Sequence, residues 1–253
     1  MSRCLLGEAV RYDGRDKHQP ALDALAGCFV VVPFCPELAA GFGVPRPAMD
    51  LVGARVMDRA AGLDLTAPLA AAVGRFVAAA GPLDGAILKA GSPSCGVGSA
   101  RRYDAVGDAA PAGRVDGLFA AALAALDPAP ARIDEAALAD RAAVARFAAA
   151  VELRRAWRAD RAVLIDELTG WAAARGDAAW IAAVRDFTMS ADQGRSVGHI
   201  DAMMVRTAID DAPPRLRAAA TVAAAVHLTM DSRIAAPRGD RSAPRRETKA
   251  GSR

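Results

Sequence analysis

The sequence predicts an α/β protein: an N-terminal three-layer domain with a mostly parallel sheet, then an all-helical C-terminal domain and a disordered basic tail. Short apolar runs alternate with alanine-rich helical stretches over residues 1–127, which is typical of strands joined by crossover helices. After residue 127 the sequence is amphipathic at helical spacing, with no strand-like run. Pro, Gly, Ser and Arg dominate the end of the chain. We therefore expect domains at 1–127 and 128–236, and the tail at 237–253.

The expected elements follow from apolar spacing and from glycine and proline punctuation. The predicted strands span 29–34, 51–57, 85–89 and 101–104. The main predicted helices span 66–81, 116–126, 135–157 and 161–175, with further helical stretches up to residue 230. Ligand sites in parallel α/β sheets gather at the carboxyl ends of the strands. The residues that follow each strand are therefore the first candidates for a functional site.

Composition limits the class of protein. The chain has 253 residues, 53% of them hydrophobic and 24% charged, which is enough for a substantial core. Arg or Asp interrupts every alanine-rich segment before it reaches membrane length, so no membrane partner is expected. Met1-Ser2-Arg3-Cys4 does not begin a secretory leader, and the expected location is the cytoplasm. Cysteines there are usually reduced thiols, ligands or catalysts.

The net charge of +3 comes from the tail. Residues 237–253 contain five arginines and one lysine against two acidic residues, a net of +4 that leaves the other residues at −1. Such a tail could bind RNA phosphates or could simply keep the chain in solution. The tail alone therefore does not decide the partner.

Three cysteines far apart in sequence stand where predicted strands end. Cys4 precedes a glycine turn, Cys35 closes the strand at 29–34, and Cys95 follows the strand at 85–89. Only three residues precede Cys4, so its strand is short or starts further upstream. No cysteine pair has the close spacing typical of zinc sites. Three lone thiolates suit an iron–sulfur cluster with one iron open. The alternative is that the three cysteines are buried core residues. Cys28 has no ligand-like motif after it, and we expect it to be a core or spare thiol.

Six short motifs together resemble consecutive signatures of the thiouracil desulfidase family, over about residues 1–127. The motifs are Cys4-Leu5-Leu6-Gly7-Glu8, Val10-Arg11-Tyr12-Asp13-Gly14, Cys35-Pro36-Glu37, Val44-Pro45-Arg46, Ile87-Leu88-Lys89 and Ser92-Pro93-Ser94-Cys95-Gly96. Each motif alone is a weak signal, but their combination in this order is specific. The resemblance implies a non-redox, hydrolytic removal of sulfur from a thiocarbonyl at a 4Fe–4S cluster.

The resemblance also implies roles for individual residues. Cys4, Cys35 and Cys95 fall at the cluster ligands, and Glu37 and Ser92 fall at the catalytic acidic residue and serine. A loop-closing role is the alternative for Ser92. We add Lys89, Arg46 and Asp13 as candidate substrate-binding residues. For Lys89 and Arg46, which could orient a carbonyl oxygen or a phosphate, a structural ion pair is the alternative.

The expected substrate is a thiolated pyrimidine, and the order of domains adds a second resemblance. The segments 118–122 and 133–147 resemble the junction in two-domain desulfidases that act on 4-thiouridine in tRNA. Both 4-thiouridine in tRNA and 4-thiouracil as a free base or nucleoside therefore remain candidates. Four arginines between residues 154 and 161 could bind phosphate or form a solvated face. A non-catalytic iron–sulfur or RNA-binding protein, with a structural or redox-sensing cluster, is the alternative function.

Overall fold

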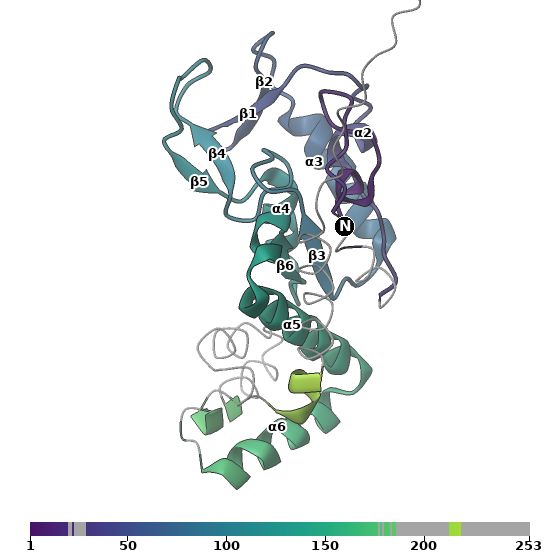
Figure 1. Cartoon of the computed structure of the whole chain (residues 1–253), viewed down its shortest axis with the longest axis vertical. Helices are drawn as coiled ribbons and strands as arrows, with labels where there is room; N and C mark the ends of the chain where they lie inside the picture. The colour runs from purple at the N-terminus through teal and green to yellow at the C-terminus, as the bar shows by residue number, and fades with distance from the viewer. Residues whose placement is uncertain are drawn as a thin grey trace, which may run out of the picture.

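The computed structural model describes residues 1–19, 22, 29–176, 178, 180–182, 184–185 and 213–218. The predicted tail, Cys28 and most of the helical stretches expected beyond residue 176 lie outside these ranges. The described part confirms the α/β class, with the sheets and helices α2–α4 in the upper part of Figure 1 and α5 and α6 in the lower part.

Four extended segments lie next to one another in the part of the fold that contains the cysteines. Strand β3 (Gly85–Leu88) pairs in parallel with β6 (Ala131–Asp134). On the other side of β3, the Ser2 amide donates to the Ile87 carbonyl oxygen at 3.1 Å. Ser2 also forms a parallel bridge with Phe34. Residues 1–3 thus lie between β3 and the end of the strand predicted at 29–34, which has ladder pairing only at Phe34.

A separate four-stranded sheet has the order β2-β1-β4-β5. It comprises β1 (Met49–Val52), β2 (Arg55–Asp58), β4 (Ala100–Tyr103) and β5 (Gly113–Val115). The pairing of β1 with β4 is parallel, and the other two pairings are antiparallel. The prediction of one strand over 51–57 is wrong, because Gly53 has a φ of 59° and reverses the chain into a hairpin.

The N-terminal helices agree with the sequence pattern. Helix α3 (Thr66–Ala80) ends at Gly81, as predicted, and α4 (Leu118–Ala124) lies within the predicted range 116–126. Two short elements, η1 (Arg3–Leu6) and α2 (Pro36–Ala39), were not predicted. Phe34 stacks on Phe76 of α3 at a centroid distance of 3.9 Å and contacts Phe119 of α4 edge-on at 4.9 Å. These aromatic contacts hold the segment before Cys35 against both helices.

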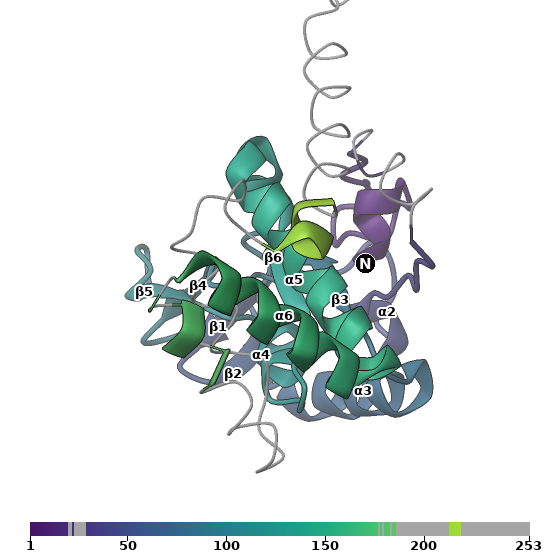
Figure 2. The same cartoon turned by 90° about the horizontal axis from the view of Figure 1, so that it is seen from below.

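The second half of the chain begins with a strand, so the expectation of no strand after residue 127 is wrong. Strand β6 is followed by η2 (Glu135–Ala139), α5 (Arg141–Ala159) and α6 (Arg161–Arg175), and α6 runs across the end of the molecule in Figure 2. Asp140 interrupts the predicted helix 135–157, because its carboxylate accepts a hydrogen bond from the Ala142 amide and begins α5. Among the described residues, no helix combines the length and apolarity needed to cross a bilayer.

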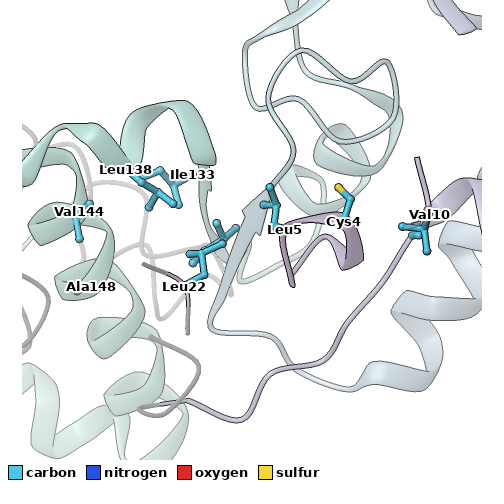
Figure 3. Close-up of a cluster of buried hydrophobic side chains, with 10 residues drawn as sticks. Cys4, Leu5, Val10, Leu22, Ile133, Leu138, Val144 and Ala148 are labelled. Carbon is cyan, nitrogen blue, oxygen red and sulfur yellow. The ribbon is translucent and has the colours of Figure 1, made fainter. Parts of the chain in front are cut away.

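The second half also completes the core behind the cysteines. Ile133 of β6, Leu138 of η2 and Val144 of α5 pack in one buried cluster with Cys4 and Leu5 (Figure 3). Helix α5 approaches β3 so closely that a Cβ at Gly85 would lie 2.6 Å from Val151 Cγ2. The hydrophobic core around Cys4 therefore contains side chains from both halves of the chain.

We predict that a chain cut after Asp127 does not fold. The cut removes the strand that pairs with β3 and the apolar side chains that cover Cys4 and Leu5, and the loss of several buried aliphatic side chains exceeds the usual stability of a domain. Circular dichroism and a thermal melt test this expectation, with a chain cut after Ala236 as the control. A soluble, cooperatively melting fragment 1–127 would contradict it.

Candidate functional site

The three predicted cysteines line one cavity of about 310 Å³. Cys4 lies in η1, immediately after residues 1–3. Cys35 is the residue before α2 and has an extended backbone, and Cys95 lies in the loop after β3. All three are free and buried. The folded chain therefore brings together three thiols that are far apart in sequence, at the ends of neighbouring extended segments.

A network of hydrogen bonds shapes the Cys95 loop. Ser92 Oγ accepts hydrogen bonds from the amides of Ser94 and Cys95, at 3.2 and 3.1 Å. The first amides of α4 and the residue before it reach the carbonyl oxygens of the loop: Gly117 donates to Gly96, and Phe119 donates to Ser94 at 2.7 Å. The loop is thus held from within by a serine and from outside by a helix, which fixes the position of the Cys95 thiol.

Gly117 is needed for this close contact between α4 and the loop. A Cβ at Gly117 would lie 2.6 Å from the Ser94 carbonyl carbon and 2.9 Å from the Cys95 amide nitrogen. Both are backbone atoms, so no side chain can move aside. Gly117 is not predictable from the sequence, because nothing in its local pattern shows which segment will pack on it.

Burial dominates the electrostatics of the thiols. It raises the pKa of Cys4 to about 11. Burial, followed by the charge of Glu37, raises the pKa of Cys35 to about 12. The fully buried Cys95 thiol has a pKa well above the usual value for the same first reason, with contributions from Glu37 and from the other two cysteines. As free thiols all three are therefore protonated at neutral pH.

Glu37 lies in the cavity beside the cysteines. Its side chain belongs to the first turn of α2, and the residue is only 7% exposed. Oε2 accepts a hydrogen bond from the Cys35 thiol at 3.2 Å. Glu37 is the only carboxylate among the residues that line the cavity in the described part of the chain. The predicted acidic residue is thus placed next to the predicted ligands.

The other predicted residues divide into two groups. Ser92, Lys89 and Arg46 line the cavity. Asp13 does not; it forms ion pairs with Arg11 at 3.4 Å and Arg15 at 3.3 Å. The ion pair that was the alternative for Lys89 is present, with Glu135 as its partner.

Seven of the residues that line the cavity have arginine or lysine side chains. The cationic residues are Arg3, Arg11, Lys17, Arg46, Arg59, Lys89 and Arg101. The Arg46 Nη1 donates to the carbonyl oxygens of Val10 and Gly43, both at 3.1 Å. The buried Arg11 Nε faces the Asp13 carboxylate at 3.4 Å, whereas the buried Arg46 Nε makes no hydrogen bond. The cavity lining is thus strongly cationic, which suits a ligand with acceptor oxygen atoms. Arg11 stood in a quoted motif but was not singled out from the sequence.

The arginines between residues 154 and 161 are engaged within the chain. Arg154 is buried and donates to the carbonyl oxygen of Ala129 at 2.6 Å. Arg155 pairs with Glu152 at 2.7 Å, and Arg158 pairs with Asp84 at 2.5 Å. Arg161 lies over the Trp157 ring. Arg154 and Arg158 therefore connect α5 to the segments around Ala129 and Asp84, whereas Arg155 and Arg161 make local contacts.

The thiols do not form a site for a single metal ion. Within the described ranges, no three His, Cys, Asp or Glu side chains are grouped so as to hold one ion. A polynuclear cluster has a different requirement, because each thiolate binds a different iron atom and the ligands surround the group instead of meeting at a point. Three separate thiols around one cavity fit that requirement.

The fold and the cavity define an α/β protein with a three-thiol site at the ends of its extended segments. A comparison with family models matches residues 1–133 to the family described as 2-thiouracil desulfurase. The chain belongs to this family, and the prediction of an enzyme that removes sulfur from thiouracil is confirmed. Among solved structures, the chain is similar to the 4Fe–4S-dependent thiouracil desulfidase TudS, with 35% identity over 54% of this chain and 89% of that chain and a TM-score of 0.45. A comparison with curated proteins gave no match.

We predict that Gly117→Ala disrupts the cysteine loop. The added methyl group overlaps backbone atoms of Ser94 and Cys95, and such overpacking typically costs about 1–3 kcal/mol. We expect a lower melting temperature and less iron bound per chain after anoxic reconstitution. Gly74→Ala is the matched control, because Gly74 lies exposed in α3 with open space around it and alanine there should stabilise the helix by about 0.5–1 kcal/mol. Equal iron content in both variants would contradict the prediction.

Proposed function

We propose that Cys4, Cys35 and Cys95 hold a 4Fe–4S cluster and that the protein uses it to remove sulfur from 4-thiouridine in tRNA, or from 4-thiouracil as a free base or nucleoside. The observation that carries the proposal is the meeting of all three cysteines in one cavity with Glu37 and Ser92. Three thiolates would leave one iron of such a cluster without a protein ligand. When bound, the cluster supplies a Lewis-acidic iron for the soft sulfur of a thiocarbonyl.

Glu37 is proposed as the group that moves protons. Its carboxylate accepts the Cys35 S–H in the structure, and a ligated thiolate no longer has this proton, so Oε2 becomes free. Oε2 can then take a proton from the water that attacks the thiocarbonyl carbon and return it to the leaving sulfur. The reaction converts a thiocarbonyl and water into a carbonyl and hydrogen sulfide, with no net electron transfer. The burial of Glu37 limits exchange of that proton with bulk water.

Ser92 is proposed as a hydrogen-bond donor. Its oxygen already accepts two amide hydrogens from the loop, so the loop-closing role is real. The hydroxyl hydrogen is not used by these bonds and remains available to the pyrimidine or to the attacking water. One residue can therefore serve both the loop and the substrate. Arg46 is proposed to bind a carbonyl or phosphate oxygen, because its side chain lines the cavity and its charge has only backbone carbonyl partners.

The assay for this function is loss of the thiocarbonyl absorbance. Anoxically reconstituted protein is incubated separately with 4-thiouracil, 4-thiouridine and tRNA that contains 4-thiouridine, and released sulfide is measured in parallel. We expect loss of the band together with stoichiometric sulfide for at least one substrate. If all three substrates keep the band while the cluster remains intact, the protein is instead a non-catalytic iron–sulfur protein.

Glu37→Gln separates chemistry from cluster binding. We expect kcat to fall by about 10²–10⁴, the usual contribution of general acid–base catalysis, because the amide cannot move a proton. Iron and sulfide content should stay at the wild-type level, since glutamine preserves the shape of the side chain. Glu167→Gln, which alters a carboxylate paired with Arg215 at 3.0 Å outside the cavity, is the control. Wild-type kcat in Glu37→Gln would remove Glu37 from the mechanism.

Salt dependence distinguishes tRNA from the small substrates. Lys17, Arg46 and Arg101, which line the cavity, attract a phosphate backbone, whereas a neutral base carries no net charge for them to attract. We expect kcat/KM on tRNA to fall steeply with ionic strength, and kcat/KM on 4-thiouracil to change little. The Lys17→Gln, Arg101→Gln double variant should reduce the slope on tRNA and leave the free base unaffected. Equal slopes on both substrates would argue that the cavity does not bind tRNA.

A further inference from the structure

Glu135 joins the second half of the chain to the cavity. It is the first residue of η2, directly after β6, and its side chain is only 9% exposed. Oε1 accepts a hydrogen bond from the Lys89 ammonium, and Oε2 accepts one from the Ala90 amide. The carboxylate thus binds both the side chain of Lys89 and the backbone that leads from β3 into the Cys95 loop.

The ammonium group of Lys89 has a defined set of partners. Besides Glu135, Nζ donates to the Ala90 carbonyl oxygen at 2.8 Å. An ammonium has three hydrogens, so one remains for the cavity that Lys89 lines. The lysine backbone is fixed as well, because its amide donates to Ser2 Oγ at 3.1 Å. Lys89 therefore presents one hydrogen from a held position, unlike a mobile surface lysine.

The ion pair also decides what kind of acceptor suits Lys89. A largely buried carboxylate already compensates the lysine charge, so the group is poorly suited to attract a further anion. It remains a strong, oriented hydrogen-bond donor. Arg46 differs, because the hydrogen bonds of its guanidinium go to uncharged backbone carbonyls and its charge stays available.

We propose that Glu135 is a positioning residue that holds Lys89 as a donor to the uncharged carbonyl oxygen of the thiolated pyrimidine. The inference rests on the proposed desulfidase function and extends it to a residue just beyond the segment 1–133 that the family model matches. Glu135 does not touch the substrate; it acts through Lys89. In the absence of the carboxylate, the flexible lysine side chain leaves its position and the substrate loses an orienting bond.

A double-mutant cycle with Glu135→Gln and Lys89→Met tests this proposal. Glutamine can still accept from the Ala90 amide but removes the charge that holds Lys89. We expect Glu135→Gln to raise KM for 4-thiouracil about tenfold with little change in kcat, the effect of losing one hydrogen bond to a charged group. In the Lys89→Met background the same substitution should change KM less than about twofold. Glu152→Gln, another partly buried carboxylate with arginine partners at 2.7 and 3.4 Å, is the control and should leave KM unchanged.

Two results would overturn the proposal: an unchanged KM in Glu135→Gln, or an equal rise in KM with and without Lys89. Iron content and melting temperature are measured for each variant. If Glu135→Gln loses iron, Glu135→Asp replaces it in the cycle, with the same expectation of no further effect in the Lys89→Met background. Failure of the desulfidase function itself is distinguishable, because it would remove turnover from the wild-type protein.

Discussion

The structure depends on the alignment of three extended segments whose ends meet at one cavity. Ser2 forms this alignment, because it bridges to Phe34 on one side and bonds to Ile87 on the other. Cys4 and Cys35 follow two of these segments directly. Cys95 lies in the loop that follows Leu88, the last residue of β3, and this loop brings it to the same cavity. A shift of any segment would move its thiol away from the other two. The backbone hydrogen bonds are therefore as important to the site as the thiols themselves.

The second half of the chain supports this alignment. Strand β6 pairs with β3, and η2 and α5 supply apolar side chains to the cluster around Cys4. Glu135 then connects the same region to Lys89 and Ala90. The predicted domain boundary at residue 127 follows the change in composition. The packing crosses that boundary, and so does the family match, which reaches residue 133.

The local features of the site and the family of the protein could be predicted from the sequence. Motif order identified Cys4, Cys35 and Cys95, and glycine marked the end of α3, because these signals are contained in short stretches. Strand β6 was missed because Ala131–Asp134 contains too few apolar residues to resemble a buried strand. This segment forms a strand because it pairs with β3. Gly117 and Glu135 were missed for a related reason, since their roles depend on contacts with residues about 20 and 45 positions away. Asp13 does not line the cavity and instead pairs with Arg11 and Arg15, a local arrangement that the motif alone does not reveal.

The most direct measurement of the central claim is the iron and acid-labile sulfide content of anoxically purified protein. It compares the wild type with Cys4→Ala, Cys35→Ala, Cys95→Ala and Cys28→Ala. We expect about four irons and four sulfides per chain in the wild type and in Cys28→Ala, and loss of the cluster in each of the other three variants. A wild-type chain without iron, or a cluster that needs Cys28 and not one of the other three cysteines, would contradict it.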